Sequence, residues 1–350
     1  MGREGQWINQ PITEAVDISN WKKDDEFGIY PEGARDKTLL YSPVYPSHEF
    51  LIPNHRYLYK YAFVRHPDQF WTEIIAYQVG CLLDVPVPPA FIAFDENDDS
   101  CGALIEWFLN YPEQPEERFV PGGDIMVNLI PNFDRKKGQQ HNFTTVENHL
   151  NFLATNKKVA MADWLTYWCD MLLFDALIGN TDRHQDNWGL LWQSSNEKLK
   201  GMQKWLLFVR ACLLWQPLNE KLKVRMTPVF DNGTSLGYEI LESKMDDFYK
   251  PDDLQKYFNR GCHHIRWQLD DKAPVQHIEL LESLVSKYPL MASRIKNKLK
   301  AFDMDSLKAI IANSTKFDIR IPLTEKRAAF VCHLIESRYL AISERIEKYP

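Results

Sequence analysis

The chain has 350 residues, of which 45% are hydrophobic and 25% are charged, and its formal net charge is −7. This apolar content is enough for one large core or two modest ones, and it excludes a chain that is disordered over its whole length. An acidic chain repels the phosphate backbone of nucleic acids unless a local basic patch overrides the net charge. We therefore do not expect a protein that binds nucleic acid by itself.

Six cysteines lie far apart in the sequence, with no Cys-x-x-Cys pair and no histidine at zinc-finger spacing. This pattern predicts ordinary thiols in a reducing compartment. Residues 1–10 contain no apolar segment of signal-peptide length, and no run of roughly 18 or more apolar residues occurs later. We expect a soluble cytoplasmic protein without a membrane partner, although an effector exported without a cleaved signal would show the same pattern.

Short runs of β-forming residues predict strands over 37–41, 56–64, 90–94 and 103–108. A helix is predicted over 69–83, because its apolar residues recur on one face, and a proline-rich run at 85–89 ends it. A loop rich in proline, glutamate and glycine, 111–124, then leads into a mainly helical part. We therefore predict an α+β protein with a β-rich N-lobe over 1–110 and a mostly helical C-lobe over 111–350.

The second part contains a strongly apolar helix, predicted over 162–178. It ends at Gly179 and Asn180 and leads the chain into the polar segment 181–187. Helical periodicity also marks 275–288, 290–302 and 325–349. We expect these C-terminal helices to be scaffold.

One internal repeat occurs beside the polar segment: residues 190–200 recur as 213–223, with nine of eleven positions identical and a shift of 23 residues. Solenoids need at least about three copies, so a local tandem duplication explains the repeat better. We expect one copy to keep a core strand. The other copy, with residues 202–212 between the two, would form an added strand or helix, so that the duplicated insert covers about 190–226.

Two polar segments, each after an apolar run, carry residue types that phosphoryl transfer requires, namely metal ligands and a positioned nucleophile. In 182–187, Asp182 and Asn187 are five residues apart, so one can face an incoming hydroxyl while the other binds Mg²⁺. The segment 228–233 predicts a strand that ends at Asp231, a second oxygen ligand, with a turn that Gly233 permits. Each segment alone is more often a salt-bridged surface loop or a simple turn. Their joint appearance in this order favours a site.

The run Asp182-Arg183-His184-x-x-Asn187 resembles the catalytic loop shared by HipA-like kinases and phosphoinositide-type lipid kinases. The N-terminal part favours the HipA-like family, because 33–40 is similar to the phosphate-side loop of HipA proteins. The segment 67–88 also resembles HipA, with a helix that bears an acidic residue and ends in a Val-Pro-x-Pro-like turn. The similarity covers roughly 25–270. It implies a two-lobed protein-kinase-like fold that uses ATP and Mg²⁺.

The resemblance assigns roles to single residues. Lys60 would hold the nucleotide phosphates, with Glu73 on the following helix as its partner, and a buried lysine head does need an acidic partner or a phosphate. Asp182 would orient or deprotonate the acceptor hydroxyl. His184 would orient this loop or touch the transferring phosphate, and an ordinary cap that bonds backbone carbonyls is equally compatible. The phosphate loop would contain Gly33, Ala34 and Lys37. The hinge beside adenine would contain Glu106, Trp107 and Phe108. The metal ligands would be Asn187 and Asp231.

Some features lie outside the HipA pattern. HipA proteins often carry a serine just before the Gly-Ala run, whose phosphorylation switches the loop out, whereas here Tyr30 is the nearest hydroxyl. Self-inactivation by that route is therefore not expected. The chain is also shorter at its N-terminus than full-length HipA proteins, so we expect an accessory subdomain to be missing or supplied by another polypeptide. We expect Arg183 to pair with a carboxylate, and the run 260–267 is a candidate for contact with an acidic substrate or a regulatory phosphate.

The leading hypothesis is a kinase that acts on Ser or Thr hydroxyls of a protein substrate. As the HipA resemblance implies, it would be a toxin whose target belongs to translation, with an antitoxin as a further partner. One alternative is a lipid or small-molecule kinase, which the lack of a basic amphipathic helix disfavours. The other is a nonenzymatic nucleotide-binding pseudokinase, which the insertion near the metal ligands favours.

Overall fold

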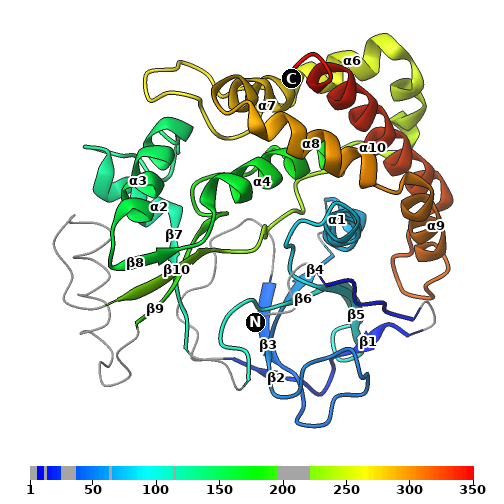
Figure 1. Cartoon of the computed structure of the whole chain (residues 1–350). Coiled ribbons are helices and arrows are strands. Elements are labelled where there is room, and N and C mark those ends of the chain that lie inside the picture. Colours follow the sequence, from blue (N-terminus) through cyan, green and yellow to red (C-terminus); the bar gives the residue numbers. More distant parts are fainter. Residues whose placement is uncertain (1–5, 12–13, 25–36, 63–64, 113–115, 195–220) are drawn as a thin grey trace.

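The computed structural model describes residues 6–11, 14–24, 37–62, 65–112, 116–194 and 221–350. Figure 1 shows strands β1 to β6 gathered at the lower end of the molecule and most helices at the upper end. The predicted α+β class, with a β-rich first part and a mostly helical second part, is confirmed.

Six strands form the first sheet, in the order β1-β5-β6-β4-β3-β2. Neighbouring strands are antiparallel, except that β1 and β5 are parallel. The four strands predicted from the sequence correspond to β3 to β6; β3 has the predicted bounds, and the other three have shifted ends. The bounds are β1 Val16–Asp17, β2 Lys22–Lys23, β3 Lys37–Tyr41, β4 Arg56–Tyr61, β5 Ala90–Asp95 and β6 Ser100–Glu106.

Side chains alternate between the two faces of this sheet, and each face has its own core. Tyr57 and Tyr59 of β4 belong to an outer cluster, whereas Leu58 belongs to the inner cluster that also contains α1. Helix α1, Phe70–Leu82, covers the inner face through contacts with β5 and β6. Lys60 comes two residues after Leu58 and therefore faces α1.

Helix α1 confirms the helix predicted over 69–83, and a short 3-10 turn, Pro67–Gln69, precedes it. It is buried on nearly all sides, because it lies between the first sheet and the C-terminal helices (Figure 1). It also contacts α4 and α9. Glu73, in its first turn, is only 3% exposed. A carboxylate in such a position needs a partner.

The loop expected over 111–124 is interrupted by strand β7, Arg118–Pro121, which pairs with β9. No local pattern reveals this strand, because its partner lies about 70 residues further along the chain. Helices α2, Gly122–Leu129, and α3, Phe143–Thr155, and strand β8, Val159–Met161, follow. Helix α4, Trp164–Ile178, confirms the predicted apolar helix and ends where Gly179 adopts a left-handed backbone with φ 68°.

Four strands form the second sheet, in the order β7-β9-β10-β8. Strands β9, Gly189–Ser194, and β10, Leu222–Met226, are antiparallel neighbours, whereas β10 and β8 are parallel. The first copy of the repeat begins within β9 and keeps a core strand, as expected. Of the second copy only 221–223 is described, at the start of β10; the stretch between the copies lies outside the described residues.

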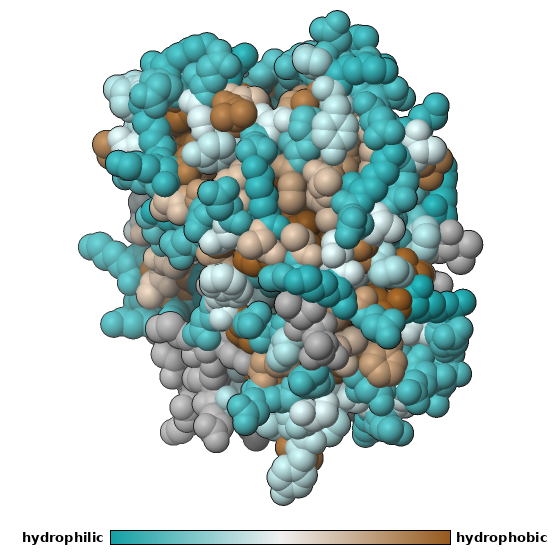
Figure 2. All heavy atoms as spheres, turned by 90° about the vertical axis from the view of Figure 1, so that its right-hand side faces the viewer, coloured by the Kyte–Doolittle hydropathy of each residue, from teal (hydrophilic) through white to brown (hydrophobic). Residues whose placement is uncertain are grey.

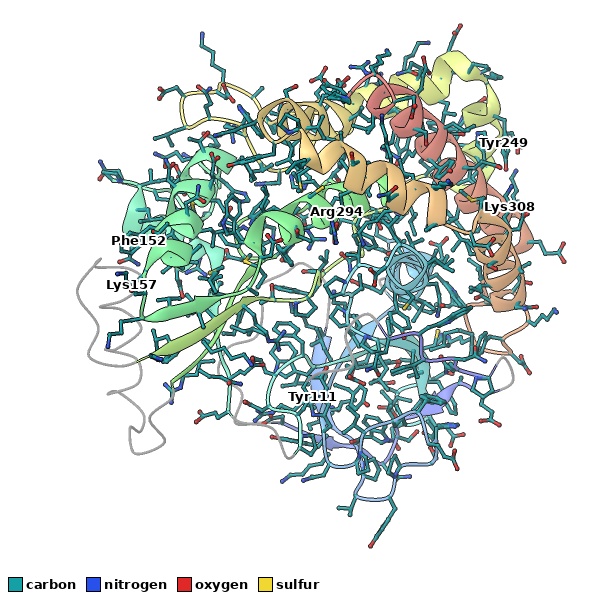
Figure 3. The ribbon with its side chains drawn as sticks, viewed as in Figure 1. Tyr111, Phe152, Lys157, Tyr249, Arg294 and Lys308 are labelled. Atoms are coloured by element: carbon teal, nitrogen blue, oxygen red, sulfur yellow. The ribbon has the colours of Figure 1, made fainter. Side chains whose placement is uncertain are left out.

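The C-terminal helices pack around α4, and α7, α8 and α10 confirm the three predicted there. Helix α10 contacts α4, α7, α8 and α9. Arg294 of α8 lies beside α4 (Figure 3), where it donates to the carboxylate of Asp170 at 2.7 and 2.6 Å. The bounds are 3-10 segment η3 Glu242–Tyr249, α6 Pro251–Arg260, α7 His277–Lys287, α8 Leu290–Ala301, α9 Met304–Ser314 and α10 Glu325–Ile346.

Figure 2 shows a face on which hydrophilic residues predominate and hydrophobic residues are scattered. Within the described ranges, no helix combines the length and the apolar character needed to cross a membrane. The five cysteines in these ranges are free thiols, as the sequence predicts, and they are Cys81, Cys101, Cys169, Cys262 and Cys332.

Candidate active site

Lys60 on β4 is the centre of a group of buried charges. The residue is 4% exposed, and its Nζ donates to Glu73 Oε1 at 2.6 Å and to Asp231 Oδ1 at 2.7 Å. A buried ammonium group needs such partners, because an unpaired charge is very costly to remove from water. This nitrogen atom is thus the meeting point of β4, α1 and the second half of the chain. Glu73, the expected partner of Lys60, is one of the two carboxylates bound there.

Strand β6 passes so close to the backbone of Lys60 that one of its positions has no room for a side chain. Gly102 of β6 pairs with Tyr61, and a Cβ atom at Gly102 would lie 2.2 Å from the carbonyl oxygen of Lys60. A glycine is therefore required at position 102 if β4 and β6 are to keep this close approach.

Lys37 of β3 lies directly opposite Lys60 in the antiparallel register. Cross-strand neighbours of this kind project from the same face of a sheet, with Cβ atoms about 5 Å apart. Lys37 is therefore on the face of the sheet that bears the buried charges. Gly33 and Ala34, the other expected residues of the phosphate loop, lie outside the described residues.

The start of α1 fixes the backbone that follows residue 231. Glu73 Oε2 accepts a hydrogen bond from the backbone N–H of Asn232 at 3.1 Å. The side chains of Gln69 and Thr72 donate to the carbonyl oxygen of Gly233 at 2.8 and 3.1 Å. The turn after residue 231 is therefore attached to the same helix that holds the lysine.

Asp231 lies in a turn and not at the end of a strand, which corrects the sequence prediction. Strand β10 ends at Met226, and 227–233 contains no strand. Asp231 itself adopts a left-handed backbone with φ 56°, whereas Gly233 has no positive φ. This conformation costs a residue other than glycine roughly 1–2 kcal/mol. The hydrogen bonds from α1 hold the turn in place against this cost.

The loop 180–187 is closed by hydrogen bonds to its own backbone. Asn187 Nδ2 donates to the carbonyl oxygen of Asp182 at 2.7 Å, and the N–H of Asp182 donates to Asn180 Oδ1 at 3.0 Å. Because Nδ2 is used within the loop, Oδ1 is the amide atom of Asn187 that can serve a cation. His184 Nδ1 accepts the N–H of Asp186 at 3.1 Å. The His184 ring therefore caps the loop by accepting a bond from a backbone N–H group, and not by donating one to a backbone carbonyl.

Arg183 is fully buried and joins this loop to the turn at 230–232. All five of its N–H donors have acceptors. Nε and Nη2 donate to Asp175 at 2.9 and 2.8 Å, and Nη2 also donates to Asn232 Oδ1 at 2.7 Å. Nη1 donates to the carbonyl oxygen of Asn187 at 3.0 Å and to that of Phe230. The expected pairing of Arg183 with a carboxylate is present, and its partner is Asp175.

Asp175 of α4 accepts two further hydrogen bonds, from Asn180 Nδ2 at 3.1 Å and from His263 Nε2 at 3.0 Å. Burial opposes a charge on Asp175, but Arg183 and His263 outweigh it and hold the pKa of this carboxyl group well below its usual range. His263 Nδ1 accepts the N–H of Ile265 at 3.3 Å. This pattern assigns the ring proton to Nε2, which donates to Asp175.

The run 260–267, a candidate for contact with an acidic substrate, is partly buried, and its buried residues are His263, Ile265 and Arg266. His263 is 1% exposed and Arg266 is 8% exposed, and Arg266 Nε donates to the carbonyl oxygen of Asp271 at 3.0 Å. The rings of His264 and His184 lie 5.9 Å apart. Burial, with the nearby His184, His263 and Arg266, lowers the pKa of His264 to about 4. His264 of this segment therefore packs near the loop 182–187, while Arg260 at its start is exposed.

The expected hinge residues lie at the end of β6. Glu106 is fully buried, and its carboxylate accepts the hydroxyl of Tyr111 at 2.9 Å; Tyr111 lies near the strands of the first sheet in Figure 3. The N–H of Trp107 donates to the carbonyl oxygen of Arg56 at 3.0 Å, and its own carbonyl oxygen is 2.7 Å from His55 Nε2. The backbone groups of Trp107 are therefore already used within the first sheet.

Phe108 connects the hinge to the turn that bears Asp231. Its ring packs against that of Phe230, with centroids 5.1 Å apart, and lies edge-on to that of Phe119 at 5.8 Å. Phe230 immediately precedes Asp231 in the sequence. Phe108, one of the three expected hinge residues, therefore contacts a neighbour of a candidate metal ligand.

Asp231 and Asn187 supply oxygen donors of the kind that Mg²⁺ prefers. Arg183 binds the backbone at residues 187 and 230, so it brings their two segments together. In the part of the chain that the structure describes, no group of three or more His, Cys, Asp or Glu side chains could hold a metal ion. Mg²⁺ commonly binds through one or two protein groups together with substrate phosphates and water. One carboxylate and one amide fit that mode of binding.

Three residues that hold the site together were not expected from the sequence, namely Asp175, Asn232 and His263. A carboxylate within the apolar helix 162–178 is the signal that could have marked Asp175, because a charge in a buried helix needs a partner. No comparable signal marks His263, since it lies 88 residues from Asp175 in the sequence.

No protein-family model and no curated protein match the sequence. The crystal structure of the Helicobacter pylori proinflammatory kinase CtkA is similar to 96% of this chain and 100% of its own, with a TM-score of 0.65 and 15% identity. HipA from Shewanella oneidensis, solved with HipB and its operator DNA, matches over 93% of this chain and 66% of its own, with a TM-score of 0.45 and 14% identity. Identities this low establish the fold alone. The chain has the two-lobed kinase-like fold that its resemblance to HipA-like kinases predicted.

Proposed function

We propose that the chain is a Mg-ATP-dependent kinase that phosphorylates Ser or Thr hydroxyls of a protein substrate. One observation carries this proposal: Lys60 Nζ lies 2.6 Å from Glu73 and 2.7 Å from Asp231. Kinases need a lysine that a helix glutamate holds beside the metal-binding aspartate, because these groups surround the phosphates during transfer. The kinase-like fold supports the same class of reaction.

Each part of the site would act through one named side chain. Lys60 Nζ would neutralise phosphate oxygens, and Glu73 would keep this ammonium group in place. The Asp231 carboxylate and Asn187 Oδ1 would hold Mg²⁺, which supplies positive charge that stabilises the transferring phosphoryl group. The Asp182 carboxylate would accept a hydrogen bond from the substrate hydroxyl and orient its oxygen for attack. His184, which caps the same loop, would keep that carboxylate in position.

The resemblance to HipA also predicts a toxin that acts on translation and a partner antitoxin. The Shewanella HipA structure contains HipB and operator DNA, which is a property of that protein. For this chain the toxin role, the antitoxin and the cytoplasmic location stay predictions. The substrate therefore has to be found by experiment.

Incubation with γ-labelled ATP, Mg²⁺ and a cell lysate separates the candidate functions. We expect label on protein with the wild type, and a rate at least about 100-fold lower for Asp182→Ala and Asp231→Ala. The matched control is Asp246→Ala, which removes an exposed carboxylate that pairs with Lys326 and should keep the wild-type rate. Label only in the lipid fraction would favour a lipid kinase. Binding of Mg-ATP without any transfer would contradict an enzyme.

The role of Lys60 has a test of its own, because binding does not require turnover. Calorimetric titration of Mg-ATP into Lys60→Ala should show an affinity at least about 10-fold below that of the wild type, since a charge-assisted bond to phosphate is lost. Unchanged affinity would remove Lys60 from the nucleotide site.

A further inference from the structure

Three of the five hydrogen bonds made by Arg183 reach the two segments that carry the candidate metal ligands. Nη1 donates to the carbonyl oxygens of Asn187 and Phe230, and Nη2 donates to Asn232 Oδ1 at 2.7 Å. Asp231 lies between the last two residues, so the guanidinium group brackets it on both sides. One planar, rigid group thereby sets the separation between the Asn187 segment and the Asp231 turn.

The other two bonds of Arg183 go to Asp175, whose carboxylate is held by further donors. A carboxylate has about four acceptor sites, and here each oxygen receives one bond from Arg183 and one from another residue. Oδ1 accepts Asn180 Nδ2 at 3.1 Å, and Oδ2 accepts His263 Nε2 at 3.0 Å. If the bond from Asn180 or the bond from His263 is lost, the Asp175 carboxylate can rotate, and its two parallel bonds to Arg183 lose their alignment.

These groups are shielded from solvent. Asp175 and Arg183 are both 0% exposed, and His263 is 1% exposed. Water cannot easily replace a lost partner at such a position, and a low local dielectric makes each unsatisfied group costly. The arrangement therefore transmits a change at His263 to the segments that Arg183 binds.

We propose that Asp175 and His263 are positioning residues, which set the geometry of the two Mg²⁺ ligands through Arg183. The inference rests on the kinase function proposed above. Groups that do not touch a metal ion commonly orient those that do, and their loss lowers metal affinity. His263 thus governs the affinity for Mg²⁺ without contacting the nucleotide.

Two substitutions of His263 separate positioning from simple packing. His263→Phe removes the Nε2 donor but keeps a buried ring, whereas His263→Gln keeps an N–H group that can reach Asp175. The matched control is His149→Phe in α3. His149 is also 1% exposed, but its two ring nitrogens have no hydrogen-bond partner among the described residues. Asn232→Ala removes an acceptor on the opposite side of Arg183 and serves as a second probe if His263→Phe does not fold.

The measured quantity is the affinity for a non-hydrolysable ATP analogue, determined by calorimetry with Mg²⁺ and again with EDTA. The ratio of the two affinities is the gain that Mg²⁺ provides. His263→Phe and Asn232→Ala should lower this gain about 10-fold and leave the affinity in EDTA unchanged. His263→Gln should restore most of the gain, and His149→Phe should retain all of it.

A wild-type gain in His263→Phe or in Asn232→Ala would overturn the inference. So would an equal loss in His263→Phe and His149→Phe, because packing alone would then explain both. A wild-type protein that gains no affinity from Mg²⁺ would instead refute the proposed kinase function, so the two failures are distinguishable.

Discussion

The ion pair between Lys60 and Glu73 predicts strong coupling between two substitutions, Lys60→Met and Glu73→Gln. The two residues are 4% and 3% exposed, so Lys60→Met leaves the Glu73 carboxylate buried without its cation, and Glu73→Gln leaves Lys60 with one carboxylate, that of Asp231, in place of two. Such a loss typically costs about 3–5 kcal/mol of the free energy of unfolding. Lys60→Met should lie near the upper end of this range, because it leaves the carboxylates of Glu73 and Asp231 facing the same position.

In the double variant the charge of Glu73 is also gone, and the remaining loss is the ion pair between Lys60 and Asp231, whose side chain is 25% exposed. The double variant should therefore be more stable than the sum of the single effects implies, by about 1–3 kcal/mol. Urea unfolding of the four proteins near pH 7, followed by tryptophan fluorescence, measures this coupling if the m-values agree. Effects that add to within about 0.5 kcal/mol would refute the buried ion pair.

Gly102→Ala should destabilise the protein by about 1–3 kcal/mol, because its Cβ would lie 2.2 Å from the carbonyl oxygen of Lys60; a wild-type melting temperature would contradict this close approach. Arg183→Lys offers three donors where five are used. At least two buried acceptors then lose a bond, at about 1–3 kcal/mol each, and a loss below about 1 kcal/mol in urea unfolding would count against the network. Burial lowers the pKa of His149 to about 4, so between about pH 6.5 and this value the unfolded chain binds a proton that the folded chain does not. Stability should therefore fall as the pH is lowered through this window, and His149→Phe should flatten the decline between about pH 7 and pH 4.5; an unchanged decline would show that another group causes it.

The elements that the sequence predicts well are long helices with many apolar residues, such as α1, α4 and α10. Their hydrophobic patterns are local, so no knowledge of distant partners is needed. The short strands β7 and β8 are different, because they are stabilised by pairing with β9 and β10, which lie far along the chain. The turn at Asp231 also escapes prediction: a favourable glycine stands two residues later, yet bonds from α1 place the positive φ on the aspartate.

The same distinction holds for the candidate site. The residues expected to meet substrate, nucleotide and metal lie in short motifs, and Lys60 and Glu73 are paired as expected. The residues that hold those motifs in place are not recognisable locally. Asp175 and His263 acquire a role only in the fold, where Asp175 binds Arg183 and His263 binds Asp175, and no sequence spacing predicts these contacts.

Asn232 belongs to both halves of the site at once. Its backbone N–H donates to Glu73 on α1, and its side-chain oxygen accepts from Arg183 beside the loop 182–187. A rotation of α1 that carried Glu73 away from Lys60 would also withdraw the acceptor from this N–H group. The position of the Lys60 ammonium group and that of the turn at Asp231 would then be lost in the same movement. The site consequently forms or comes apart as one unit, and states in which only half of the site is formed are disfavoured.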